Sequence, residues 1–207
     1  ANTTGYIYND HPYKLADWCA PYGYDSAQQY FETSTAYYYY GLCIMAQTAG
    51  VLGRKEDEKR YSDLAVKVKE VFLAKYYDAE NHCYGTQTLT SFCAELGLYP
   101  EGEKAAMADW CAQDIVSHDY HVTCGHLGLR YIYKFMSEFG YYEVLDKTLN
   151  SRTYPSFGAQ IEMGATTLWE SFTLSTHRQS LNHPFKGAFS LWLYAVSYTH
   201  LTLPTIR

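Results

Sequence analysis

One glutamate of this chain stands beside aromatic residues in a pattern that suits acid–base chemistry. Glu170 ends the run Gly-Ala-Thr-Thr-Leu-Trp-Glu at residues 164–170, and Ser-Leu-Asn-His follows at residues 180–183. A carboxylate beside rings such as that of Trp169 loses hydration, which raises its pKa and makes it a usable base near neutral pH. We therefore predict that Glu170 does the chemistry. The alternative is that Glu170 caps or pairs near the start of a helix.

The sequence around Glu170 resembles a family signature. Residues 164–170, together with Tyr-Pro-Ser-Phe-Gly at 154–158 and Ser-Leu-Asn-His at 180–183, are similar to the signature of the bacterial α-L-rhamnosidases of glycoside hydrolase family 78. His-Val-Thr-Cys-Gly at residues 121–125 and Leu-Ala-Asp-Trp at residues 15–18 resemble further stretches of that family. The resemblance implies an all-α fold built of antiparallel helix pairs. This fold would be the C-terminal part of an (α/α)6 barrel of the six-hairpin glycosidase type.

The resemblance also implies roles for individual side chains. Glu170 matches the general base of an inverting glycosidase, in which a second carboxyl group about 6.5 to 9.5 Å away acts as the acid. In the family that acid lies in an Asp-Glu motif followed by Gly-Trp and Gly-Asp, upstream of the matched stretches, and this motif is not found in the sequence. Asp17 and Trp18 match an Asp-Trp pair whose indole lines the pocket for the rhamnose methyl group. Trp169 adjoins the base, and His183 matches a histidine that contacts sugar hydroxyls.

The expected function follows from these matches. The parent protein is expected to release terminal α-L-rhamnose from plant glycosides or polysaccharide side chains, with Glu170 activating water. Because the acid is missing, we expect the chain by itself to be inactive. Each residue also has a structural alternative: a helix-start acid beside a core indole for Asp17 and Trp18, and a hydrogen-bonded structural residue for His183. Glu162 could bind a sugar hydroxyl or anchor its loop.

Two other functions stay open. A different (α/α)6 carbohydrate enzyme, such as an unsaturated uronyl hydrolase or a trehalase-like glucosidase, is the first. An acidic sugar would need several arginines near the pocket, and the only candidates are Arg130, Arg152 and Arg178. The second is a non-catalytic sugar-binding helical domain. The absence of the acid motif is the feature that favours this alternative for the isolated chain.

Composition narrows the class of protein. The chain has 207 residues, a formal net charge of -6 and 23 tyrosines, and 17% of its residues are aromatic. Aromatic rings pack against the C–H faces of sugars, which favours a carbohydrate partner, although a tyrosine-rich core is the alternative. The negative charge and the lack of a long basic cluster argue against nucleic acid. No apolar run approaches the roughly 20 residues that span a bilayer, so we expect no membrane partner.

The cysteines and histidines do not form metal-binding patterns. The six cysteines lack Cys-x-x-Cys and zinc-finger spacing, so we expect buried free thiols. With no visible signal peptide, this pattern favours the cytoplasm. His118, His121 and His126 match no His-Glu-x-x-His pattern and are predicted to be structural. We expect no metal and no cofactor, and the sequence does not indicate an oligomeric state.

Apolar residues recur at helical spacing along most of the chain. The pattern predicts three successive helix pairs and a last helix; the expected helices cover residues 31–49, 61–72, 86–98, 107–111, 127–139, 142–149 and 185–196. Residues 150–163 are predicted to be a loop, followed by a helix that begins near Thr166. We expect one partial catalytic domain at residues 1–196. Residues 197–207 resemble a translated adapter or vector scar and are expected to be a non-native tail.

Overall fold

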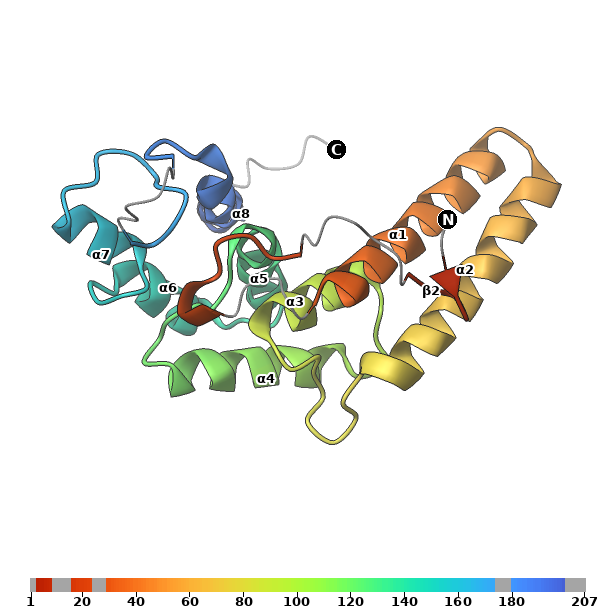
Figure 1. The fold of residues 1–207 in the computed structure, drawn as a ribbon, viewed down its shortest axis with the longest axis horizontal. Coiled ribbons are helices and arrows are strands. Elements are labelled where there is room, and N and C mark those ends of the chain that lie inside the picture. The colour runs from red at the N-terminus through yellow and green to blue at the C-terminus, as the bar shows by residue number, and fades with distance from the viewer. Residues whose placement is uncertain (1–2, 9–15, 24–28, 174–179, 200–207) are drawn as a thin grey trace.

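The computed structural model describes residues 3–8, 16–23, 29–173 and 180–199, and this part of the chain is mostly helical (Figure 1). Its elements are β1 (Thr3–Thr4), β2 (Ile7–Tyr8), η1 (Pro21–Gly23), α1 (Tyr30–Val51), α2 (Lys55–Tyr76), α3 (Gln87–Leu96), α4 (Lys104–Ser117), α5 (His126–Glu138), α6 (Tyr142–Asn150), α7 (Phe157–Glu162), η2 (Pro184–Phe189) and α8 (Ser190–Thr199). Leu15, Arg178 and residues 200–207 of the predicted tail lie outside the described residues. The predicted all-α class is confirmed.

Consecutive helices pair as the sequence predicts. Short turns join α1 to α2, α3 to α4 and α5 to α6, and the long α1–α2 hairpin projects at one end of the elongated molecule (Figure 1). Helix α3 packs against α1, α4 and α5, and η2 and α8 pack against α5. None of the described helices is both long enough and apolar enough to cross a membrane.

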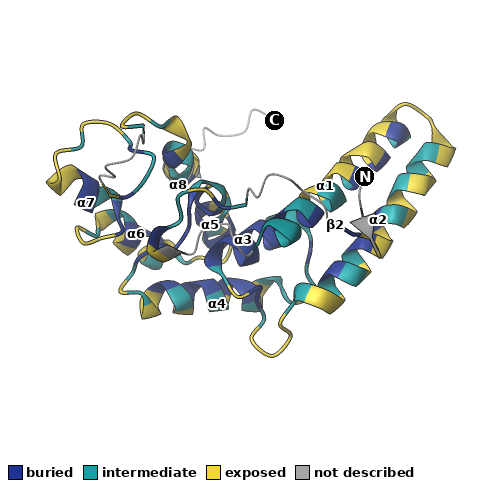
Figure 2. Cartoon of the chain, in the orientation of Figure 1, coloured by how far each residue is buried: buried dark blue, intermediate teal, exposed yellow. Residues whose placement is uncertain are grey.

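Helix α3 illustrates how the local sequence sets an element. The Thr86 side chain accepts a hydrogen bond from the Leu89 N–H at 3.2 Å, which caps the first turn. Gly97 follows the last turn with φ 79°, a left-handed conformation that glycine adopts without steric cost. All residues from 87 to 94 are buried (Figure 2). Because α3 is covered on every side, it forms the centre to which the neighbouring helices are attached.

Some of the tyrosines belong to the core. Tyr84 and Tyr133 are 6% and 1% exposed, and their hydroxyl groups bond to the Leu98 carbonyl at 2.7 Å and the Thr148 hydroxyl at 2.9 Å. A buried hydroxyl without such a partner would destabilise the fold. For these residues the alternative of a tyrosine-rich core is correct. The six cysteines are all free thiols, and Cys83, Cys93, Cys111 and Cys124 are buried.

Two predictions after α6 were wrong. Residues 157–162, expected in a loop, form α7, where the Ser156 hydroxyl accepts a hydrogen bond from the Ala159 N–H at 3.0 Å. A helix of six residues is too short to show a clear apolar period. The helix expected near Thr166 does not form, because the chain leaves α7 through Gly164 at φ 91° and continues in non-helical conformation to residue 173. Glu170 therefore does not lie on a helix.

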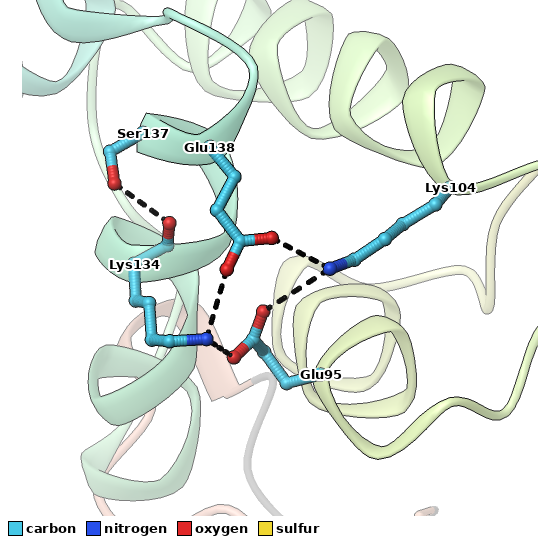
Figure 3. A network of polar contacts seen from close by, with 5 residues as sticks. All are labelled: Glu95, Lys104, Lys134, Ser137 and Glu138. Atoms are coloured by element: carbon cyan, nitrogen blue, oxygen red, sulfur yellow. Dashed lines mark hydrogen bonds and ion pairs between the residues drawn. The ribbon is translucent and has the colours of Figure 1, made fainter.

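Four charged side chains connect α3, α4 and α5 (Figure 3). Lys134 of α5 pairs with Glu95 of α3 and lies 2.9 Å from Glu138 on its own helix. Lys104 of α4 contacts Glu138 at 2.6 Å and Glu95 at 3.7 Å. The Glu95 side chain is only 8% exposed, so it is shielded from water and depends on the two ammonium groups.

This network gives a stability prediction. Glu95→Gln removes the shielded charge and leaves Lys104 and Lys134 sharing Glu138 alone. We expect the free energy of unfolding to fall by about 1 to 3 kcal/mol, measured by urea denaturation. Glu80→Gln, at an exposed position, is the control for loss of one negative charge. Equal stabilities of the two variants would contradict the proposed role of the network.

Candidate active site

Glu170 lies on a non-helical segment that forms backbone hydrogen bonds with residues 180–183. The Glu170 N–H donates to the Ser180 carbonyl at 2.9 Å, and the His183 N–H donates to the Leu168 carbonyl at 2.7 Å. Trp169 is buried, with 5% of its surface exposed, and the Glu170 side chain is 15% exposed.

The Glu170 carboxylate meets side chains from two distant parts of the sequence. The Trp18 indole N–H donates to Oε1 at 2.8 Å, although the two residues are 152 positions apart. The Ser180 N–H donates to Oε2 at 2.8 Å, and Nδ1 of His183 lies 4.0 Å from the same oxygen. The structure thus brings together three of the predicted site residues, Trp18, Glu170 and His183.

These donors set the protonation state of Glu170. The hydrogen bond from the Ser180 N–H lowers the pKa of the carboxyl group most, followed by the bond from the Trp18 indole, and both outweigh the opposite effect of burial. A donor to the charged form stabilises the carboxylate relative to the acid. The predicted rise in pKa was wrong, because two N–H groups donate to the carboxylate and their effect on the pKa exceeds that of burial. Glu170 is ionised at neutral pH.

Asp17 attaches the Trp18 segment to the start of α5. Its side chain is 3% exposed, and its oxygens accept hydrogen bonds from the Thr88 hydroxyl, the Gly125 N–H at 2.7 Å and the Leu127 N–H at 2.9 Å. The first N–H groups of a helix have no partner within the helix and attract a negative charge. Burial raises the pKa of Asp17, and these hydrogen bonds act against that rise.

A close backbone approach accompanies this attachment. The His126 N–H donates to the Trp18 carbonyl at 2.9 Å. A Cβ atom on Gly125 would lie 2.2 Å from that same oxygen, so no larger residue fits without moving the segment. Cys19, directly after Trp18, has φ 56°, which is an unfavourable conformation for a residue other than glycine. These contacts therefore fix the conformation of the backbone around Trp18.

A pocket of about 510 Å³ lies next to Trp18 and His183, the two side chains near the Glu170 carboxylate. Its lining comes from the Trp18 segment, α1, α5 and η2, and consists of Ala16, Trp18, Tyr37, His126, Leu127, Arg130, His183 and Phe185. Glu170 itself, Asp17 and Trp169 do not belong to this lining. Trp18 and Phe185 are 50% and 71% exposed, so their rings are available to a ligand.

His126 is a site residue that the sequence analysis missed. Its Nε2 lies 2.8 Å from the Glu170 carbonyl oxygen, and its ring centroid lies 4.6 Å from that of His183. His126 directly follows the predicted motif at residues 121–125, and this position in the sequence could have identified it as a site residue.

His121, in contrast, is 5% exposed and bonds to the His118 carbonyl at 2.7 Å and the Thr153 hydroxyl at 2.9 Å, as expected of a structural residue. No group of three possible metal ligands occurs among the described residues.

The two described candidate arginines differ in position. Arg130 lines the pocket and is exposed. Arg152 pairs with Glu162, and both side chains are exposed, at 73% and 55%. The first alternative for Glu162, contact with a sugar hydroxyl, receives no support from this pairing.

Lys186 is a buried cation near the site. Its side chain is fully buried, its Nζ has no hydrogen-bond partner among the described residues, and it lies 3.6 Å from the centroid of the Phe172 ring. Burial lowers the pKa of Lys186 to about 8, with the negative charge of Asp17 acting in the opposite direction. The contact with the ring face stabilises the ammonium group in place of water.

Comparison with known proteins identifies the family of this chain. The sequence model of the bacterial alpha-L-rhamnosidase 6 hairpin glycosidase domain matches residues 2–196. The chain belongs to this family. The predicted partial six-hairpin fold is confirmed by structural neighbours from the same family.

Individual proteins to which this chain is similar are alpha-L-rhamnosidases. An alpha-L-rhamnosidase of Formosa agariphila is 30% identical over 89% of the chain and 21% of its own length. The structure of the alpha-L-rhamnosidase from Dictyoglumus thermophilum is 38% identical with a TM-score of 0.79, over 88% of the chain and 21% of that protein. The Streptomyces avermitilis alpha-L-rhamnosidase, solved in complex with L-rhamnose, is 26% identical with a TM-score of 0.80, over 93% of the chain and 19% of that protein. The chain thus spans about a fifth of the length of these relatives.

The hydrogen bond from Trp18 gives a prediction for the pKa of Glu170. Trp18→Phe keeps an aromatic ring but removes the indole N–H, so the carboxylate loses one donor and its pKa should rise. The measurement is a pH titration of the Glu170 side-chain carboxyl by ¹³C NMR. Ser180→Ala keeps the backbone N–H that bonds Oε2 and should leave the pKa unchanged. An unchanged or lower pKa in Trp18→Phe would contradict this account.

Lys186 gives a prediction for stability against pH. Its pKa of about 8 lies below the 10.5 of an unperturbed lysine, so protonated Lys186 costs stability below pH 8, and the cost disappears as the pH rises to 10.5. The free energy of unfolding of Lys186→Met minus that of wild type should therefore be larger at pH 7 than at pH 10, by up to about 3 kcal/mol. Urea denaturation at both pH values measures this difference, with Lys67→Met at an exposed position as the control. A difference independent of pH would contradict the prediction.

Proposed function

We propose that this chain forms the part of an inverting α-L-rhamnosidase catalytic domain that carries the general base, Glu170. The observation that carries the proposal is the ionised Glu170 carboxylate, held by the Trp18 indole and close to His183, two residues that line the adjacent pocket. The names of the relatives support the reaction class. The complex of the Streptomyces avermitilis enzyme with L-rhamnose supports the sugar.

In this proposal Glu170 accepts a proton from water. The water oxygen forms a bond to the anomeric carbon while the glycosidic bond breaks, and a second carboxyl group donates a proton to the departing oxygen. Glu170 is ionised at neutral pH and can accept a proton, although its lowered pKa makes it a weaker base than a glutamate with a raised pKa would be. Its hydrogen bonds fix the carboxylate, which reduces the reorganisation needed when the water is activated.

The pocket suits a deoxysugar. Trp18, Leu127 and Phe185 offer apolar surface for the methyl group and the C–H face of the ring, and His183 offers a polar group for hydroxyls. Asp17 and Trp169, predicted to bind substrate, are buried, so we assign them indirect roles. Asp17 positions the Trp18 segment, and Trp169 anchors the non-helical segment that carries Glu170.

The second carboxyl group is proposed to come from the parent protein outside this chain. The Glu170 carboxylate accepts from the Trp18 indole and the Ser180 N–H, and none of the described residues that line the adjacent pocket carries a carboxyl group. General acid catalysis contributes roughly 10² to 10⁴ in rate. The chain alone is therefore predicted to bind the sugar without efficient hydrolysis.

Glu170→Gln in the parent protein tests this function. The amide keeps the size of the side chain but cannot accept a proton, so turnover of p-nitrophenyl α-L-rhamnopyranoside should fall about 10² to 10⁴-fold with little change in KM. Glu162→Gln, which removes an acid paired with Arg152 away from the pocket lining, should retain turnover. Wild-type turnover in Glu170→Gln would remove Glu170 from the mechanism and would favour a non-catalytic sugar-binding role for this segment.

A further inference from the structure

The hydrogen bond between His126 and Glu170 fixes the tautomer of the histidine ring. Nε2 of His126 lies 2.8 Å from the backbone carbonyl oxygen of Glu170. A carbonyl oxygen only accepts, so Nε2 must carry the proton. In the neutral ring Nδ1 is then unprotonated and is an acceptor.

The Nδ1 atom is the nitrogen left for a ligand. His126 lines the pocket together with Trp18, His183 and Phe185. Within the described part of the chain, no protein donor is found on Nδ1, whereas Nε2 and the backbone N–H of His126 are both used. A half-buried acceptor in a pocket gains free energy when a ligand donates to it. Sugar hydroxyls are donors of this kind.

The surroundings keep the ring neutral. Burial lowers the pKa of His126 below its ordinary 6.5, and the electrostatic influence of Lys186 and of the neighbouring His183 acts in the same direction. The bond to the Glu170 carbonyl and the charge of the Glu170 carboxylate act in the opposite direction but do not reverse the shift. The ring is therefore an acceptor at neutral pH.

We propose that His126 is a substrate-binding residue: its Nδ1 accepts a hydrogen bond from a hydroxyl group of the bound sugar, while its Nε2–H holds the Glu170 segment against the start of α5. This inference rests on the proposed function, because it uses the same pocket and the same sugar. It adds a polar contact from α5 that the sequence motif around Glu170 does not contain. It also makes His126 a link between the base and the Trp18 segment, whose carbonyl accepts from the His126 N–H.

NMR of the 207-residue chain with L-rhamnose tests the proposal. ¹⁵N spectra distinguish a protonated from an unprotonated ring nitrogen, and we expect His126 to be protonated at Nε2 only. Addition of L-rhamnose should move the Nδ1 resonance of His126 and the indole N–H resonance of Trp18 with the same apparent Kd. A protonated Nδ1 and unprotonated Nε2 in the free chain would overturn the proposal.

Two variants separate the ligand contact from the structural contact. In His126→Gln the amide N–H₂ can replace Nε2–H toward the Glu170 carbonyl, but the acceptor at the Nδ1 position is lost. We expect an unchanged Trp18 indole resonance in the free variant and up to about ten-fold weaker binding of L-rhamnose, the loss typical of one neutral hydrogen bond. His126→Phe loses both contacts and should also shift the Trp18 resonance before sugar is added.

The dependence of binding on pH adds a readout that a structural role would not change. Protonation of His126 converts Nδ1 from an acceptor to a donor, so wild-type affinity should fall as the pH drops through the pKa of His126, below 6.5. His126→Gln retains His183, so the difference between the pH dependence of L-rhamnose affinity in wild type and in this variant reports the protonation of His126. If His126→Gln binds like wild type at every pH while Trp18 responds to the sugar, this inference is wrong and the proposed function stands. If neither Trp18 nor His183 responds to L-rhamnose, both are wrong.

Discussion

The candidate site depends on a buried carboxylate at the start of α5. Asp17 bonds to the N–H groups of Gly125 and Leu127, which α5 cannot satisfy itself, and this fixes the segment that carries Trp18. Trp18 in turn donates to Glu170. The glycine at position 125 permits this contact, because any Cβ there would meet the Trp18 carbonyl. Two segments far apart in the sequence are thus joined through one helix end.

The same arrangement explains the electrostatics of Glu170. Burial by aromatic rings and donation by N–H groups have opposite effects on a carboxyl pKa, and in this site donation prevails. The cost of burying charge appears elsewhere, at Lys186, whose pKa is lowered and whose ammonium group is stabilised by the Phe172 ring. A charged residue kept in a buried position beside a site is consistent with a protein that trades stability for function.

Much of the fold could be predicted from the sequence, because apolar periodicity reports helices directly. The helices from α1 to α6 lie where the pattern predicts them, whereas the last predicted helix, at residues 185–196, is divided between the 3-10 helix η2 (Pro184–Phe189) and α8 (Ser190–Thr199). The non-helical segment at Glu170 could not be predicted, since its hydrogen bonds with residues 180–183 depend on the tertiary fold rather than on local preference. The direction of the Glu170 pKa shift was missed for a similar reason: the Trp18 donor is 152 residues away. His126 was also missed, because a single histidine in a sequence does not reveal which groups its two nitrogens will face.

The central claim is that Glu170 activates water for a single displacement at the anomeric carbon. The most direct measurement is ¹H NMR of the first sugar released by the parent protein from an α-L-rhamnoside, recorded before the anomers interconvert. The account predicts β-L-rhamnose, since attack by water inverts the configuration. Initial release of α-L-rhamnose would contradict it, because retention requires a covalent intermediate and a different role for Glu170.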